Sequence, residues 1–404
     1  MGKGCGLPIG KKPKLKFGIP RQTQDFRSVD VAFAENRGEV KPTKNSPSMI
    51  RILLLALSVV LLGSTAGVRI DELKNQPDLI TKESILEDYL EFTPLLPPLF
   101  TNITQLVFVT DWSPRGYVFT GINAKRILYV SFAWFTVVPD FDAFGKCTGL
   151  KIQGVEMNEN KLLRIAQAIA KFCHKNGFDG AVIKALTPLS DGIFYEDIIA
   201  GNNPDLVDLY RDMLETLEQV GTVIRKSGLI AIFSMKSPIT LHNMDQEKKF
   251  FALPPDFSHK MIEAYDFVHV WYRDLELLNR QYIHDRLLEE IMKFFNYSPK
   301  LLMGINFFGY EFPLDEYRKG GNGKKWTVIS YERFLEILRK DDAVFTFNEV
   351  NKEHELISES ANAFIVYPSR TQLEYSLAHI KQHPGVGIGI WEYGQGLDYF
   401  VNLV

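Results

Sequence analysis

The stretch Phe178-Asp179-Gly180-Ala181-Val182-Ile183-Lys184-Ala185-Leu186 tells most about the fold of this 404-residue chain. It is short and apolar, and it follows Gly177, where an amphipathic helical stripe ends, so it indicates a buried strand. Successive side chains of a strand point to opposite faces, so Val182, Lys184 and Leu186 share one face. An unpaired charge on a buried face is costly, so Lys184 is expected to have a partner.

Short strands alternate with amphipathic helices on both sides of this stretch, which is the βαβ rhythm of a parallel sheet. The expected strands cover residues 106–111, 127–134, 150–155, 180–185, 229–235, 267–272, 301–307 and 386–391. Eight strands with crossover helices predict an α/β fold, a TIM (β/α)8 barrel, whose functional site lies at the C-terminal ends of the strands. In such a barrel the face that carries Val182 and Lys184 points inward.

The second crossover is unusually short for this scheme. Only 15 residues separate Trp134 from Leu150, and a crossover with its helix needs at least about 10–12 residues. Two glycines and two aspartates in this stretch do not indicate a helix. The connection is therefore expected to be a bare loop, or a segment is missing from the sequence.

The charge of the chain is divided unevenly. Residues 1–48 carry ten Lys or Arg and four Asp or Glu, a net charge of +6, which leaves −9 for the rest of a chain whose total is −3. The basic segment has no sustained apolar period and is expected to be disordered. An acidic body argues against nucleic acid as a partner, because nucleic-acid binding requires a basic face.

Residues 49–66 have the order of a secretory signal peptide: Arg51, an apolar run over 52–62, and small residues at 64–66. The run is well short of the ~20 residues of a spanning helix, so a cleaved signal is favoured over a signal anchor and no stable membrane anchor is expected. Either alternative places the body in the secretory pathway, secreted or lysosomal. Residues 67–100 form a proline-terminated lead-in segment, and residues 101–404 form the barrel.

Two pairs of residues bear on this location. Asn102 and Asn296 begin N-glycosylation sequons, which favour a secreted glycoprotein. Cys147 and Cys173 could pair in an oxidising compartment, or Cys173 could be a buried free thiol on the apolar stripe of its helix. The sequence leaves both alternatives open.

The opening stretch resembles the signature strand of the family 18 glycoside hydrolases, the chitinase family, whose pattern is Asp-Gly-x-Asp-x-Asp-x-Glu. The first aspartate, Asp179, is present with its glycine. Val182 and Lys184 occupy the positions of the next two aspartates, and Leu186 occupies that of the proton-donating glutamate. This chain therefore resembles the family in its frame and departs from it at the catalytic positions.

Other expected strand ends carry the same resemblance. Residues 131–134 resemble the family's Ser-Phe-Ala strand, residues 270–273 its Met-x-Tyr-Asp strand, and residues 387–392 its last strand, which ends in a tryptophan. The tail 393–400 resembles a non-catalytic branch of the family. The family's members often carry a large α+β insertion after the seventh strand. Here the stretch 309–330 is too short for it, so no large insertion is expected.

The resemblance implies chemistry that this chain cannot complete. Family 18 hydrolysis is substrate-assisted and needs a general acid, whose contribution is typically ~10²–10⁴-fold. Leu186 cannot donate a proton, and Lys184 would repel the cationic intermediate. Asp111 and Glu392 are the candidates for a relocated acid, or for the partner of Lys184. We therefore expect a pseudo-glycosidase with no catalytic residue, no cofactor and no metal.

A sugar presents an apolar face that stacks on aromatic rings, with a few directed polar contacts. By resemblance Trp391 forms the floor of the central subsite and Tyr272 points inward like the family's tyrosine, so strand alternation turns Trp271 outward. The expected carbohydrate-binding residues are Trp391, Tyr272, Trp112, Trp134, Glu392, Asp111 and Asn306. His379 and His383 lie one helical turn apart, but without a third ligand in view they are expected to lie on a solvated helix face.

The resemblance implies a lectin for chitooligosaccharides or related microbial glycans, including lipopolysaccharide, with a role in innate immunity. It also implies a scavenger or sorting receptor of the stabilin type as a partner. Two alternatives stay open: a cryptic glycoside hydrolase with a relocated acid, and an interaction protein with a vestigial sugar groove.

Overall fold

The computed structural model describes residues 29–36, 80–90, 103–141, 147–152, 155–156, 161–184, 204–239, 256–272, 284–319, 326–349 and 352–403. Leu186, Asn102 and the expected signal peptide at 49–66 lie outside these ranges, so the structure does not test them. In the described part of the chain, no helix combines the length and apolar character that crossing a membrane requires.

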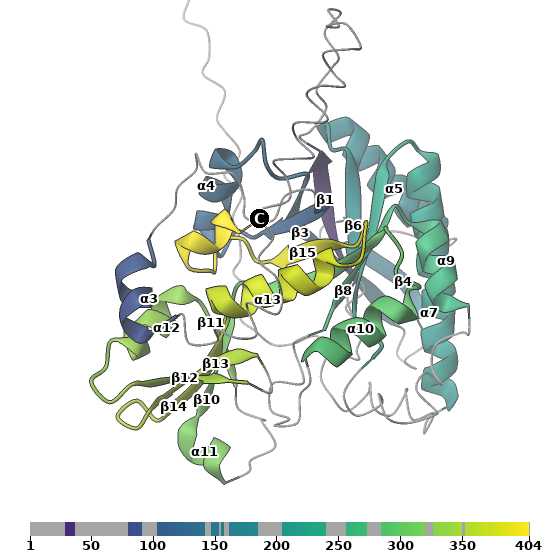
Figure 1. Ribbon diagram of the computed structural model, residues 1–404. Coiled ribbons are helices and arrows are strands. Elements are labelled where there is room, and N and C mark those ends of the chain that lie inside the picture. The colour runs from purple at the N-terminus through teal and green to yellow at the C-terminus, as the bar shows by residue number, and fades with distance from the viewer. Residues whose placement is uncertain are drawn as a thin grey trace, which may run out of the picture.

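Within the described residues, seven parallel strands form a nearly closed barrel with helices around it (Figure 1). They are β2 (Gln105–Val109), β3 (Tyr129–Phe141), β6 (Gly180–Lys184), β7 (Ile230–Lys236), β8 (Phe267–Trp271), β9 (Leu301–Asn306) and β15 (Gly387–Trp391). The last strand, β15, pairs in parallel with both β9 and β2, which joins the end of the barrel to its beginning. The TIM-barrel prediction is confirmed.

Helices pack on the outside of this barrel. They are α4 (Pro114–Ile122), α5 (Lys161–Asn176), α7 (Pro204–Lys226), α9 (Phe257–Ala264), α10 (His284–Phe294) and α13 (Arg370–Lys381). A large apolar cluster between sheet and helices contains Phe233 and Tyr265, whereas a smaller one containing Phe108 and Val182 fills the barrel interior. Cys173 of α5 is a buried free thiol, and burial raises its pKa to about 12.

The expected third strand at 150–155 is wrong. The long strand β3 turns back into β4 (Cys147–Ile152), which pairs with it antiparallel, and β4 pairs antiparallel with the short β5 (Val155–Glu156). The physical reason is length: antiparallel strands can be joined by a very short turn, whereas a parallel crossover needs a dozen residues or more. The short second crossover is thus a β-hairpin.

Strand β1 (Val29–Asn36) occupies the position left open in the barrel. It pairs antiparallel with β3 and with β6, so that Phe33 lies opposite Phe132 on one side and Ala181 on the other. Residues 1–48 were expected to be disordered, and for 29–36 that expectation is wrong. The two facing edges of β3 and β6 expose unpaired backbone groups, and a segment with alternating apolar residues can satisfy both.

Residues 309–367, between β9 and β15, form a second sheet with the antiparallel order β11-β10-β14-β13-β12 (Figure 1). The insertion comprises β10 (Gly309–Pro313), α11 (Leu314–Arg318), β11 (Thr327–Ile329), α12 (Tyr331–Leu338), β12 (Val344–Asn348), β13 (Glu353–Ser358) and β14 (Ala363–Tyr367). The expectation of no large α+β insertion is therefore wrong. It considered only the chain up to residue 330, whereas the alternating strands that complete the sheet follow that point.

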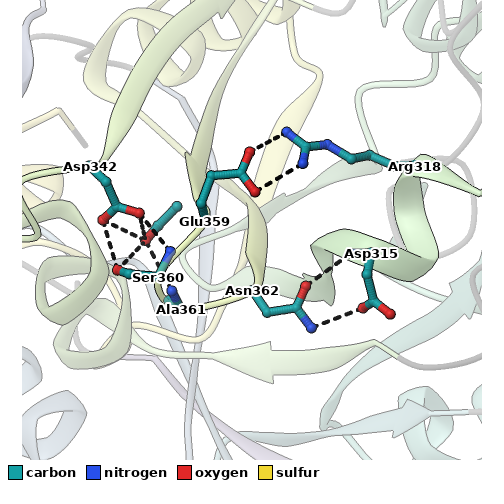
Figure 2. Close-up of polar contacts among 8 residues, drawn as sticks. Asp315, Arg318, Asp342, Glu359, Ser360, Ala361 and Asn362 are labelled. Carbon is teal, nitrogen blue, oxygen red and sulfur yellow. Dashed lines mark hydrogen bonds and ion pairs between the residues drawn. The ribbon is translucent and has the colours of Figure 1, made fainter.

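Polar contacts hold the turn between β13 and β14 in place (Figure 2). The Asp342 carboxylate accepts hydrogen bonds from the backbone N–H (2.6 Å) and hydroxyl group (2.8 Å) of Ser360, which lower its pKa to about 2. The Arg318 guanidinium of α11 donates to both carboxylate oxygens of Glu359, with Nη1 2.9 Å from Oε2. These contacts tie α11 and the segment between α12 and β12 to the same turn.

The lead-in segment contributes α3 (Lys82–Asp88), whose first turn is capped by Thr81. Its Ile85 side chain is buried in the main apolar cluster. The chain ends in a short 3-10 helix, Asp398–Asn402, which begins where the Asp398 backbone N–H donates to the Tyr89 carbonyl, 2.9 Å away. Residues from the lead-in segment and the tail are therefore in direct contact.

Candidate functional site

The C-terminal ends of the barrel strands bring together the side chains that the sequence singled out. Lys184 is the last residue of β6, Trp271 of β8, Asn306 of β9 and Trp391 of β15. Trp391 and Asn306 are direct neighbours in the parallel register of β15 and β9. This rim is the end at which TIM barrels place their functional sites.

Four aromatic side chains meet at this rim, and we call Phe108, Trp112, Trp271 and Trp391 the rim aromatic cluster. The Trp391 ring centroid lies 4.9 Å from that of Trp271, 5.1 Å from that of Phe108 and 6.4 Å from that of Trp112. Trp271 is 9% exposed, whereas Trp112 is 61% exposed. The cluster thus has a buried base and an open face, which suits stacking against the apolar face of a sugar ring.

The Lys184 ammonium group lies over two rings of this cluster. Its Nζ atom is 4.4 Å from the Trp391 ring centroid and 4.8 Å from that of Trp271. Cation–π attraction to indole is strong when the pair is desolvated, ~2 kcal/mol or more. The sequence predicted the inward position of Lys184 but not these two contacts; its pairing with Asp111 or Glu392 stays a prediction.

The expected orientations of Trp271 and Tyr272 are wrong. Trp271 faces Trp391 inside the rim, while Tyr272 is buried in the apolar cluster between sheet and helices. Side chains of this strand do alternate between its two faces, because His269, two residues before Trp271, also faces inward. The sequence interpretation took its inward position from the family's tyrosine, which shifted the pattern of this strand by one residue.

Two polar residues inside the barrel position Trp271. The Trp271 indole Nε1–H donates to the Ser234 hydroxyl oxygen at 3.1 Å, and this hydroxyl group lies 2.9 Å from His269 Nδ1. The Ser234 hydroxyl oxygen already accepts from the indole, so its proton is available to Nδ1. His269 is fully buried, and burial first, then the charge of Lys184, lower its pKa to about 3. The imidazole is therefore neutral, and in the tautomer that carries its proton on Nε2 its Nδ1 accepts from the Ser234 hydroxyl group.

The imidazole of His269 fits where it does because β15 has glycine beside it. A Cβ atom added to Gly389 would lie 2.2 Å from His269 Cδ2. Sequence reasoning missed Ser234 and His269. The available signal was a polar residue between apolar neighbours on the inward face of each of two strands, Ser234 in β7 and His269 in β8.

The two carboxylates considered as a relocated acid differ in environment. Glu392 follows Trp391 directly; its side chain is fully buried, and burial raises the pKa of its carboxyl group. The neighbouring Thr110 and Ser113 hydroxyl groups oppose this rise. Asp111 is exposed at the end of β2. A raised pKa favours a general acid, and both carboxyl oxygens of Glu392 are buried.

The remaining predicted residues lie as follows. Asp179 is exposed just before β6, and Val182 is buried in the barrel interior. Trp134 lies within β3, and its side chain is outside the described part of the structure. Asn306 is buried at the rim, and Asn296 is exposed in the turn after α10.

The insertion adds aromatic residues beside the rim. Trp391 packs against a second apolar cluster that contains Phe308 and Tyr310 of the insertion sheet and its entrance. Trp326 packs edge-on against Tyr310, with ring centroids 5.2 Å apart at 82°. The surface around Trp391 therefore extends beyond the barrel itself.

Among the described residues, one group of three potential metal ligands converges: Glu289, His379 and His383. They lie on α10, on α13 and just after α13, away from the rim. No metal had been expected from the sequence, because Glu289 is 90 positions or more from the two histidines and its proximity is decided by the packing of the helices.

Comparison with known proteins gives likenesses of fold. No family model matches the chain. A chitinase from Chromobacterium violaceum is similar in structure, with 9% sequence identity over 74% of this chain and 98% of that chain, and a TM-score of 0.48. The C-terminal domain of a putative chitinase from Desulfitobacterium hafniense has 15% identity over 75% of this chain and 99% of that chain, with a TM-score of 0.47.

The spore cortex-lytic enzyme SleL of Bacillus megaterium is a third similar structure, with 16% identity, coverage of 76% of this chain and 75% of that chain, and a TM-score of 0.47. At such identities and TM-scores these likenesses assign no activity to this chain. The fold and the site define a barrel protein with an aromatic rim. Any assignment of a ligand or an activity depends on the residues at this rim.

Proposed function

We propose that this chain is a non-hydrolytic carbohydrate-binding protein of the chitinase-like, family 18 type, and that the rim aromatic cluster binds its glycan. The observation that carries the proposal is the position of Lys184. Its ammonium group lies against Trp391 and Trp271, on the strand where the family's hydrolases need carboxylates. A fixed positive charge there disfavours the cationic intermediate of hydrolysis and leaves the stacking surface for binding.

The expected ligand is an N-acetylglucosamine oligosaccharide or a related microbial glycan, lipopolysaccharide included. Trp391 is expected to stack on the central sugar ring, with the exposed Trp112 beside it. Asn306, the neighbour of Trp391 in the sheet, is available for a directed polar contact. Flat stacking with few hydrogen bonds predicts affinity that grows with the number of sugar units.

Residues 393–400 resemble the tail of the non-catalytic branch known as chitinase domain-containing protein 1, or stabilin-interacting chitinase-like protein. We extend the proposal accordingly to a secreted or lysosomal location, to N-glycosylation at Asn102 and Asn296, and to a stabilin-type receptor as partner. Support for the location comes from the signal-like residues 49–66.

Calorimetry with chito-oligomers of increasing length tests this function. Trp391→Ala is expected to weaken binding tenfold or more, a loss of at least about 1.4 kcal/mol, because its ring is the centre of the cluster. Tyr117→Ala is the matched control, since Tyr117 is an exposed aromatic residue on α4, outside this cluster. Unchanged affinity in Trp391→Ala would refute the assigned site.

One observation favours the alternative of a cryptic hydrolase: burial raises the pKa of the Glu392 carboxyl group, as a general acid requires. This alternative predicts turnover of a fluorogenic chitobioside that disappears in Glu392→Gln. Release of reducing ends from chitin at ordinary enzyme rates would contradict the non-hydrolytic proposal. No turnover together with chito-oligomer binding would support it.

A further inference from the structure

Helices α10 and α13 lie side by side on the barrel because each leads into one of two neighbouring strands, β9 and β15 (Figure 1). Glu289 belongs to α10, His379 to the last turn of α13, and His383 to the turn that follows. This end of the barrel is where β9 and β15 begin. It is opposite to the rim that carries Trp391, so the two sites can be tested separately.

The three side chains converge with their ligand atoms toward one point. Glu289 Oε2 lies 3.3 Å from His383 Nε2 and 3.7 Å from His379 Nε2, and all three ligand atoms lie within 4.8 Å of one another. A tetrahedral zinc ion with bonds of ~2.0–2.1 Å separates its ligand atoms by roughly 3.3–3.4 Å. Two of the three separations are thus close to those of a zinc site before any ion is bound.

Tyr297 supports this arrangement from the turn after α10. Its hydroxyl group donates a 2.6 Å hydrogen bond to Glu289 Oε1, which leaves Oε2 directed at the histidines. Its ring also stacks on that of His383, with centroids 5.0 Å apart and planes 18° apart. Outer partners that orient a ligating carboxylate and an imidazole ring are characteristic of metal sites.

The two turns that carry these residues approach closely. Gly385, two residues after His383, has a φ of 91°, and a Cβ atom there would lie 2.5 Å from Pro299 Cβ, two residues after Tyr297. A side chain at Gly385 would therefore separate His383 from Tyr297. The backbone is thus shaped for the contact between the two turns.

An ordinary ion pair between histidine and glutamate is the alternative explanation, and the chain contains one for comparison. On α9, His259 Nε2 lies 3.2 Å from Glu263 Oε1, and these side chains are 72% and 68% exposed. The side chains of His379 and His383 are only 17% and 22% exposed, and both histidines lie beside the same carboxylate oxygen, Oε2 of Glu289. Two protonated imidazoles so close together would repel one another, whereas a metal ion uses both in neutral form.

We propose that Glu289, His379 and His383 bind a divalent transition-metal ion, zinc by preference, with a water molecule in the fourth position. Imidazole nitrogen and carboxylate oxygen are normal zinc ligands, and two histidines with one glutamate form a known set with an open position. The ion joins α10 to the end of α13, and so stabilises the beginning of β9 and β15. It lies too far from the rim to take part in glycan binding directly.

Calorimetric titration of the full chain, stripped with a chelator and then given zinc chloride, tests the proposal. The wild-type protein is expected to bind one zinc ion and to show a higher melting temperature with zinc than without. The double variant His379→Gln/His383→Gln is expected to lose this binding and the zinc-dependent shift. Tyr297→Phe, which keeps all three ligands, is expected to weaken zinc binding roughly 10–100-fold.

His259→Gln is the matched control, because it removes a histidine from an ion pair that has no third ligand within the described part of the chain. It is expected to bind zinc as the wild type does. Circular dichroism of each metal-free variant separates loss of binding from loss of folding. Failure of the stripped wild type to take up stoichiometric zinc would overturn the proposal, as would unchanged zinc affinity in the folded double variant.

Discussion

The buried imidazole of His269 makes the stability of the barrel depend on pH in a way that one substitution can isolate. His269 is neutral in the folded protein, where burial and the neighbouring Lys184 lower its pKa to about 3. In the unfolded chain a histidine titrates near ~6.5. Below that value the unfolded chain binds a proton that the folded protein does not. The contribution of the neutral imidazole to the free energy of unfolding is therefore fully present above pH ~6.5 and is lost as the pH falls toward about 3.

The size of the effect follows from the pKa difference. At about pH 5, roughly 1.5 units below the histidine value of the unfolded chain, the cost to the folded state is about 2 kcal/mol, at ~1.4 kcal/mol per unit. Near pH 7.5 the cost is close to zero. In His269→Gln the group cannot titrate, so the difference in unfolding free energy between wild type and variant should shrink by about 2 kcal/mol between these two conditions.

Urea unfolding followed by tryptophan fluorescence at the two pH values measures this difference. The variant also loses packing and the contact with Ser234, but that loss is present at both pH values and cancels in the comparison. His354, whose pKa burial lowers to about 4, titrates in both proteins and cancels as well. A difference between wild type and His269→Gln that stays constant from pH 7.5 to pH 5 would refute the assignment of a neutral, buried imidazole.

Three further predictions follow from the rim and from β1. Ser234→Ala removes the oxygen that accepts from Trp271 and contacts His269, so the free energy of unfolding should fall by about 1–3 kcal/mol in urea titrations. A variant as stable as the wild type would contradict a stabilising role for these two contacts. Leu186→Glu alone should not produce turnover of a fluorogenic chitobioside, since Lys184 remains two positions before it in the sequence. Measurable hydrolysis would show that the lysine does not prevent turnover. A chain that starts at residue 67 lacks β1 and leaves the edges of β3 and β6 unpaired, so its melting temperature should be lower than that of the full chain. Equal melting temperatures would show that β1 does not contribute to thermal stability, and N-terminal sequencing of the protein isolated from cells would show which chain is produced.

Several elements could be predicted because their signal is local. Strands β6, β7 and β9 are short apolar runs between helices, and the structure places them within one residue of the expected ends. Helix α5 ends directly before Gly177, as its apolar stripe indicates. The positions of Lys184 and Trp391 at the rim follow from strand ends alone, because all strands of a parallel barrel end at the same side.

Other features were wrong or missed because their signal is not local. The partner of residues 147–152 is not a property of that stretch alone, because it is set by the preceding strand β3, against which they pair antiparallel. The inward face of Trp271 depends on the register of β8 against β7, where Trp271 lies opposite Lys236. The insertion was missed because the expectation considered only the chain up to residue 330, whereas β12, β13 and β14 follow that point.

Composition and periodicity were sufficient for the class of fold and for most strand and helix positions, since these are properties of consecutive residues. The indole contacts of Lys184, the link from His269 to Trp271, and the meeting of Glu289 with His379 and His383 were decided by folding in three dimensions. Each of these contacts joins segments that lie far apart along the chain. The sequence pattern of one segment does not indicate which other segment it will contact. Closure of the barrel brings them together, because it sets which strands and helices are adjacent and in which register.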